Sequence, residues 1–333
     1  MSNIYLLFLL NGAVQGRLIP SAVLALPAWI SWEVCLLYLV GLAFLVAGLV
    51  IAKKEAPQTG LLDRFVLLGP VFFAAPIAVF GTEHFLEARA MAQAVPSWIP
   101  GHLFWVYFVG AALICAAVSI LAKRYVGLSA TLFGIMMLLF EASLHIPRVF
   151  GAPHNRFAWN IVLREFTFAG GAFALAITQS EEWRTRGTHR FLWVPRLLIG
   201  IPVLVFGVEY FLYPQYVPGI PLNRLMPAWV PVAPVWNYAT GAVQVVTGLC
   251  LVINRKARLA ATWLGLTILF HVIFIYVPIL ATQASSLSNQ LNLNYVFDTL
   301  LLSGAAFLLA GSQSPQPAIK PALASQPELA TTK

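Results

Sequence analysis

Charged residues are scarce in this chain, at 10% of its 333 residues, whereas soluble domains carry about 25%. Hydrophobic residues make up 60% and the mean hydropathy is +0.82. Long apolar runs recur along almost the whole length, so the sequence predicts a polytopic protein embedded in a lipid bilayer, without a separate soluble domain. The net charge of +8 does not indicate nucleic acid, because the basic residues cluster in short loops between the apolar runs.

Cysteine is equally scarce, and its placement excludes several redox chemistries. Cys35, Cys115 and Cys250 each lie inside an apolar run and form no close pair. This spacing argues against a CxxC redox motif and against a disulfide. No nucleotide-binding loop, catalytic serine elbow or cysteine nucleophile motif is present. Because the sequence shows no motif for a redox cofactor of its own, any redox role would require a partner protein.

The apolar runs predict an all-α transmembrane bundle of about nine spans. The apolar pieces of residues 1–30 are too short to cross a membrane and are expected to form an interfacial arm. The tail at 312–333 is rich in Pro, Ser, Ala and Gln and is expected to be disordered. The spans are expected near Trp32–Ile51, Arg64–Leu86, His102–Ala122, Gly127–Ile146, Phe157–Thr178, Leu192–Tyr213, Val235–Ile253, Arg258–Ile279 and Asn292–Ala310.

The loops between these spans differ in charge. Those on one side hold most of the basic residues, namely Lys53, Lys54, Arg64, Lys123, Arg124, Arg184, Arg186, Arg190, Arg196, Arg255, Lys256 and Arg258. The alternate loops hold only Arg89, Arg148, Arg156 and Arg224. Because cytoplasmic loops carry the excess of lysine and arginine, we expect a bacterial inner (plasma) membrane protein with a periplasmic N-terminus and a cytoplasmic C-terminus.

The chain repeats itself after the first predicted span. One constant offset relates Trp98, Pro100, Trp105, Tyr107 and Gly110 to Trp229, Pro231, Trp236, Tyr238 and Gly241. The match extends upstream, from Glu83 to Glu209, and downstream, from Asn160 to Asn294. The repeat predicts two parallel four-helix units, at 61–180 and 190–311, related by an axis along the membrane normal. Residues 1–60 would form the arm and one extra transmembrane helix.

The chain resembles a known family through four segments of the first unit. They are Phe80-Gly81-Thr82-Glu83-His84-Phe85, Pro96-Ser97-Trp98-Ile99-Pro100, Trp105-Val106-Tyr107 and His145-Ile146-Pro147. This order resembles the DoxX-like family of small four-helix membrane proteins, closely over 64–178 and less closely over 190–310. The resemblance implies two such units fused behind one extra helix. Members of that family have been linked to quinone-dependent sulfur oxidation, to terminal oxidases and to oxidative-stress complexes.

Polar residues inside the predicted spans gather in the outer half of the membrane. A charge in hydrocarbon costs about 3 kcal/mol or more, so each of these residues requires a reason. Their distribution predicts a polar pocket in each unit, open to the outside and closed toward the cytoplasm. The first unit contributes Glu83, His84, Glu141, His145, Asn160, Arg164 and Glu165. The second contributes Glu209, Asn237, His271, Asn294 and Asp298.

The spacing of these residues suggests a binding or proton-handling site. Glu141 and His145 stand four residues apart on one predicted helix face, as do Asn160 and Arg164 on the next span. His84 and His145 can exchange protons with a ligand, while Arg164 can hold an anionic or carbonyl oxygen. The alternative is a structural ion-pair network that fixes helix register. A metal ion has a set of possible ligands here but no diagnostic motif, and the histidines do not form a haem-binding set.

These observations predict a membrane protein of DoxX-like character whose periplasm-facing pocket binds a small ligand such as a quinone or quinol in a redox pathway. The enzyme class stays open. The first pocket is the better candidate, because His145 and Arg164 correspond to Tyr276 and Asp298 in the second unit. The alternatives are a small-molecule transporter, which the repeats favour but the apolar inner half does not, and a non-catalytic membrane assembly subunit.

Overall fold

The computed structural model describes residues 31–55, 60–179, 188–219, 224–282 and 286–313. Within these residues, nine helical segments are long and apolar enough to cross a membrane. The prediction of an all-α bundle with about nine spans is therefore confirmed. The predicted interfacial arm at 1–30 and the predicted tail beyond Gln313 lie outside the described residues.

The observed spans begin and end within a few residues of the predicted ones. They are Trp32–Lys54, Leu61–Leu86, His102–Ala122, Val126–Gly151, Arg156–Thr178, Trp193–Leu212, Ala233–Val252, Ala257–Thr282 and Gln290–Ser312. The helices that build them are α2 (Trp32–Glu55), α3 (Leu61–Leu67), α4 (Gly69–Leu86), α6 (His102–Ala122), α7 (Val126–Phe140), α8 (Ile146–Gly151), α9 (Arg156–Gln179), α11 (Trp193–Leu212), α12 (Ala233–Val252), α13 (Ala257–His271), α14 (Val277–Thr282) and α15 (Ser286–Ser312). A short helix, α5 (Ala88–Met91), follows α4.

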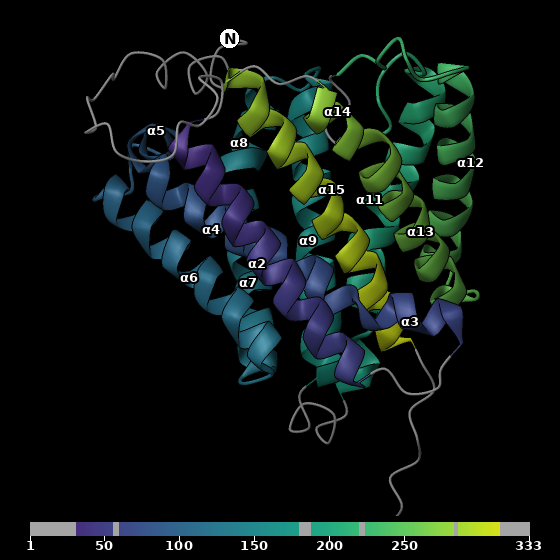
Figure 1. Ribbon diagram of the computed structural model, residues 1–333, viewed down its shortest axis with the longest axis horizontal. Helices are drawn as coiled ribbons and strands as arrows, with labels where there is room; N and C mark the ends of the chain where they lie inside the picture. The colour runs from purple at the N-terminus through teal and green to yellow at the C-terminus, as the bar shows by residue number, and fades with distance from the viewer. Residues whose placement is uncertain (1–30, 56–59, 180–187, 220–223, 283–285, 314–333) are drawn as a thin grey trace, which may run out of the picture.

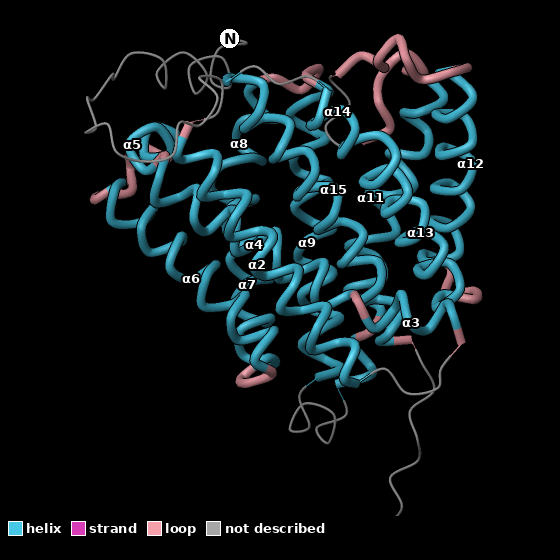
Figure 2. Tube along the Cα trace, in the orientation of Figure 1, coloured by secondary structure: helices cyan, strands magenta, loops and turns pink. Residues whose placement is uncertain are grey.

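Eight of these helices form a closed ring of neighbours, each packed against the next. The order around the ring is α4, α6, α7, α9, α11, α12, α13 and α15, and α15 then packs against α4. In Figure 1, α6 and α12 lie at opposite edges, with α9 and α15 between them. α9 and α15 also pack against each other across the middle of the ring, and α2 covers α4 from outside. In Figure 2, described loops lie at both ends of the bundle, and a long one connects α11 to α12.

The ring order shows how the two repeats fit together. α4 packs extensively against α15, and α11 packs against α9. The first helix of each repeat therefore lies against the last helix of the other repeat. The two four-helix units are interlocked, and each requires one helix of the other to close its own side of the bundle.

Contacts made in the first repeat recur at the matched positions of the second. Phe85 stacks on Tyr107 with ring centroids 5.7 Å apart, and Phe211 stacks on Tyr238 at 5.9 Å. Two indole N–H groups also donate to proline carbonyl oxygens at the same distance of 3.0 Å, from Trp105 to Pro100 and from Trp236 to Pro231. Tryptophan and proline of this kind anchor helix starts at a membrane interface.

Small residues let α9 and α15 approach closely at the centre of the ring. A Cβ atom on Gly171 would lie 2.5 Å from the Cβ of Ala305, which occupies the matched position of the other repeat. Gly304 similarly lies against the backbone of Phe72 and Phe73 on α4. Because van der Waals packing drives helix association in lipid, such close contacts hold the two repeats together.

Both α7 and α13 run into a five-residue π-helical turn, at Glu141–His145 and at Val272–Tyr276. The N–H of Ile146 bonds to the carbonyl of Glu141, so the repeat distance is five residues here. Pro147 follows directly and supplies no N–H for the ordinary helical ladder. The α-helical spacing predicted for Glu141 and His145 is therefore corrected to a π-helical one, in which Glu141 is buried. Arg148, which follows Pro147, is exposed.

We predict that Gly171→Ala destabilises the protein, whereas Gly151→Ala does not. The added methyl at 171 meets Ala305 backbone and Cβ atoms at 2.5–2.7 Å, while the same methyl at 151 meets nothing within 4 Å. Overpacking of this kind costs about 1–3 kcal/mol, more than alanine's gain in helix propensity. Thermal unfolding of both purified variants in detergent measures the difference. Equal midpoints would show that α9 and α15 do not depend on this contact.

Candidate functional site

A cavity of about 400 Å³ lies between α4, α6, α7, α9 and α15. It is reached near the end of the bundle that carries α5 and α8, since Met91 of α5 contributes to its wall. Most of the wall is apolar, formed by Ile77, Phe80, Met91, Leu113, Phe133, Met137, Phe140, Phe157, Phe168, Leu291 and Leu301. The polar or ionisable residues of the wall are Glu83, His84, His145, Arg164, Glu165, Asn294, Tyr295 and Asp298.

The structure groups the candidate site residues differently from one pocket per repeat. Five of the seven first-unit candidates line the cavity, and the exceptions are Glu141 and Asn160. Asn294 and Asp298 of the second unit line the same cavity, because α15 packs against α4. The other three second-unit candidates do not line this cavity; they are Glu209, Asn237 and His271. The cavity is therefore shared between the two repeats.

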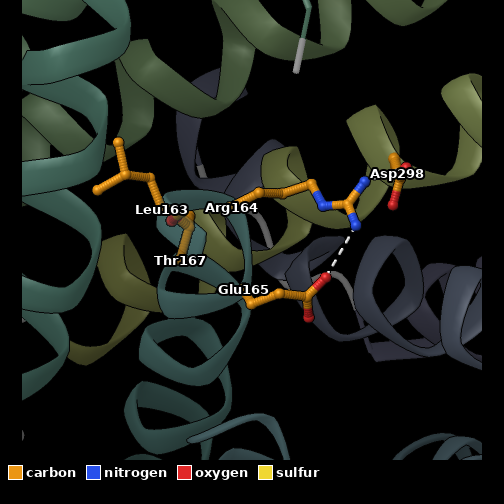
Figure 3. Close-up of polar contacts among 5 residues, drawn as sticks. All are labelled: Leu163, Arg164, Glu165, Thr167 and Asp298. Carbon is orange, nitrogen blue, oxygen red and sulfur yellow. Dashed lines mark hydrogen bonds and ion pairs between the residues drawn. The ribbon is translucent and has the colours of Figure 1, made fainter. Parts of the chain in front are cut away.

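A buried ion pair crosses the ring beside the cavity. The guanidinium of Arg164 donates to Asp298 through Nη1 at 2.7 Å and to Glu165 through Nη2 at 2.9 Å, and Figure 3 shows Arg164 extending between these two carboxylates. Arg164 and Asp298 occupy matched positions of the two repeats, on α9 and α15. The pair therefore joins two equivalent sites whose residue types have diverged to opposite charge.

The sequence placed Asp298 in the second unit and did not predict its pairing with Arg164. It also did not predict the contact of Gln290 with Glu83. The sequence did contain a signal for the first of these contacts, because Arg164 and Asp298 occupy matched positions of the repeat and carry opposite charges. The signal predicts an ion pair only if α9 and α15 are known to be neighbours.

Glu83, near the end of α4, is held by two amides of α15. Its Oε1 accepts hydrogen bonds from Asn294 Nδ2 at 2.8 Å and from Gln290 Nε2 at 2.9 Å. In the other repeat, Glu209 lies within the electrostatic influence of Asn160 and Arg156 of α9, but neither side-chain atom of Asn160 makes a hydrogen bond among the described residues. Asn160 thus faces Glu209 rather than the cavity. Each glutamate is paired with the last helix of the opposite repeat.

One ring nitrogen of His84 forms a hydrogen bond within its own helix, α4. Its Nδ1 lies 2.7 Å from the carbonyl oxygen of Phe80. A carbonyl oxygen only accepts hydrogen bonds, so Nδ1 carries the proton of this bond. The second ring nitrogen, Nε2, is then the atom that His84 offers to the cavity.

Glu141 is the most deeply buried of the candidate carboxylates. Its side chain comes from the π-helical turn, and the residue is 1% exposed. Neither carboxylate oxygen has a hydrogen-bond partner among the described residues. Two charged residues that line the cavity, Glu165 and Arg164, act on it electrostatically. A buried polar group without a partner is costly, and Glu141 is one of several such residues in this core.

The second repeat carries different residues at the positions matched to the cavity histidines. Tyr210 and Tyr276 occupy the positions matched to His84 and His145, and both are buried. His271 is buried on α13, and its Nε2 lies 3.0 Å from the hydroxyl of Thr240. Among the described residues, no three His, Cys, Asp or Glu side chains gather as they would around a metal ion.

Carboxyl groups are concentrated at the end of the bundle where the cavity lies. Glu87 follows the last residue of α4. Partial burial raises the pKa of the Glu87 carboxyl, and the nearby carboxyl groups of Glu83 and Glu33 raise it further. This end of α4 and the start of α2 therefore form an acidic region beside the cavity.

The fold and the cavity together define a class, a multi-pass α-helical membrane protein with a polar cavity inside its helical ring. Comparisons with protein-family models, with curated proteins and with solved structures find no match to this chain. The function is therefore inferred from the chemistry of the cavity.

We predict that Arg164→Ala destabilises the protein far more than Arg258→Ala. Removing Arg164 leaves Asp298 and Glu165 buried without their cation, which costs about 3–5 kcal/mol. Arg258 pairs with Asp63 at 2.5 Å, but both side chains are about 40% exposed, and such pairs contribute about 0–1 kcal/mol. Thermal unfolding in detergent compares the two variants. Similar losses would mean that the central pair does not hold the repeats together.

Proposed function

We propose that this protein binds a quinone-class ligand, a quinone or its quinol, in the cavity shared by the two repeats. The observation that carries the proposal is the combination of a mostly aromatic and aliphatic wall with a few convergent polar groups. A volume of about 400 Å³ falls within the range of roughly 300–1,000 Å³ for small-molecule sites. The resemblance to the DoxX-like family supports the same class of ligand.

The wall suits a flat ring with oxygen atoms at its edge. Phe133, Phe140 and Phe168 offer ring faces and edges against which an aromatic ligand packs. Met137 adapts to an irregular apolar outline. His145 and Arg164 carry N–H groups that can donate to head-group oxygens, and the Nε2 of His84 can accept from a head-group hydroxyl. An isoprenoid tail would lie among the apolar residues of the wall and the surrounding lipid.

The proposal includes an orientation in a bacterial inner membrane. Basic residues such as Lys53, Lys123 and Arg255 lie at the ends of α2, α6 and α12. The cavity lies toward the opposite ends of the helices, near α5 and α8. The positive-inside rule supports a cavity that faces the periplasm. Electrons gained or lost by a bound quinone would pass to or from a partner redox protein.

The two alternatives differ from this proposal in what they require of the cavity. A transporter requires a polar route toward the other side, yet the core below the cavity is made of apolar residues such as Phe73, Ala130 and Ala172. An assembly subunit requires only the ion pair and the interlocked helices. A ligand that occupies the cavity and is lost when the cavity is filled would distinguish the proposal from both.

We predict that quinone co-purifies with the wild-type protein and is lost from Met137→Trp. Met137 lines the cavity on α7, and an indole in its place fills the ligand space while leaving the ion pair intact. Extraction of the purified protein with organic solvent, followed by mass spectrometry, measures bound quinone per protein.

The matched control for this experiment is Leu139→Trp on the same helix. Leu139 is 61% exposed and faces away from the cavity, so this variant should retain the wild-type quinone content. A wild-type protein that carries no quinone and binds none on titration would refute the proposal. Equal loss in both tryptophan variants would point to a general effect of tryptophan on this helix.

A further inference from the structure

We infer that the cavity prefers the reduced ligand, a quinol with two hydroxyl groups, over the oxidised quinone, because the polar atoms it leaves available are mainly hydrogen-bond acceptors. This inference rests on the proposed function, since it specifies which redox form of the quinone-class ligand the same cavity binds. It is derived from the hydrogen bonds in which His84, Asn294 and Arg164 already use donor atoms; His145 also lines the cavity and keeps one ring N–H as a donor.

His84 is the first acceptor. Its Nδ1–H donates to the carbonyl of Phe80, and this bond fixes the tautomer of the neutral ring. The remaining nitrogen, Nε2, then carries a lone pair and no hydrogen. Because His84 lines the cavity, a ligand hydroxyl can donate to Nε2, whereas a ligand carbonyl cannot bond to it.

Asn294 is the second acceptor. Its amide nitrogen donates to Glu83 at 2.8 Å, which fixes the orientation of the amide. Its Oδ1 is buried and has no hydrogen-bond partner. A buried carbonyl oxygen without a partner gains from a ligand that donates a hydrogen bond, and it disfavours a ligand that places another acceptor there.

The carboxylates add further acceptors. Three carboxylates line the cavity, those of Glu83, Glu165 and Asp298. Among the described lining residues, the basic side chain with a permanent charge is that of Arg164. Its Nη1 and Nη2 atoms donate to Asp298 and Glu165. An ionised carboxylate is an acceptor through both oxygens. Three carboxylates beside one guanidinium therefore leave oxygen atoms that can accept a hydrogen bond from a ligand. The resulting excess of negative charge also disfavours an anionic ligand.

The two redox forms of the ligand differ in the atoms they present. A quinone carries two carbonyl oxygens, which only accept hydrogen bonds, while a quinol carries two hydroxyl groups, which also donate. A ligand that satisfies one buried acceptor binds about tenfold more tightly than a ligand that leaves the acceptor without a hydrogen bond. We therefore expect the quinol to bind at least about tenfold more tightly. By linkage, each tenfold preference raises the two-electron midpoint potential of the bound couple by about 30 mV.

The experiment compares both forms on the full-length protein in lipid nanodiscs. A short-chain benzoquinone and its chemically reduced quinol are titrated separately under anaerobic conditions, and calorimetry gives the two dissociation constants. A quinol that binds tenfold or more tightly supports the inference. Equal affinities, or tighter binding of the quinone, overturn the inference and leave the proposed function standing. Binding of neither form overturns the proposed function itself.

Variants of His84 test the origin of the preference. His84→Phe removes the Nε2 acceptor and should reduce the affinity ratio between quinol and quinone severalfold, mainly by weakening the quinol. His84→Gln retains an acceptor oxygen and should retain part of the ratio. The control is His271→Phe, which removes a buried histidine outside the cavity and installs the residue found at the matched position, Phe140.

A ratio that does not change in His84→Phe, or that falls equally in the His271→Phe control, would overturn the role assigned to His84. A loss of both affinities by the same factor would indicate a structural effect on the cavity, and it would also contradict the assignment. If His84→Phe fails to fold, His84→Gln and the wild-type ratio still decide the question.

Discussion

The exchange of last helices between the two repeats is the constraint on which the rest of the structure depends. α9 and α15 cross at the contact between Gly171 and Ala305 and each then packs against the first helix of the other repeat. The polar groups follow the same exchange, since Glu83 bonds to Asn294 and Arg164 bonds to Asp298. In a membrane, where burial of apolar surface does not drive helices together, close packing and such polar contacts supply the association.

The two halves share a framework but not a site. The stacked aromatic pairs, the π-helical turns and the glutamate–asparagine contacts recur in both. The side chains toward the ligand space differ, because Tyr210 and Tyr276 stand where the first repeat has His84 and His145. Buried phenol rings thus stand in the second repeat at the positions of two histidines that line the cavity in the first. The second repeat contributes Asn294 and Asp298 to the wall of that cavity.

Hydropathy was sufficient to find the spans, because each crossing requires about 20 apolar residues whatever its neighbours are. The same apolar runs predict how far along its span each polar residue lies. They do not predict which neighbouring helix a side chain faces, because that depends on the packing of the helices. The sequence therefore did not predict that Asn294 and Gln290 of α15 bond to Glu83 of α4. The π-helical turn at Glu141 was signalled by Pro147, but the sequence does not distinguish it from an ordinary kink.

A structural network and a binding site make different demands on buried polar atoms. A network that only fixes helix register requires every member to be paired, because an unpaired group in a low-dielectric core costs more than the pairing gains. The carboxylates of Asp298 and Glu83 and the two Nη atoms of Arg164 meet that requirement. The Oδ1 of Asn294 does not, although it is buried and its residue lines the cavity. Register alone gives no reason for this atom to be without a partner. A ligand that donates hydrogen bonds does, and for this reason binding explains the cavity better than scaffolding.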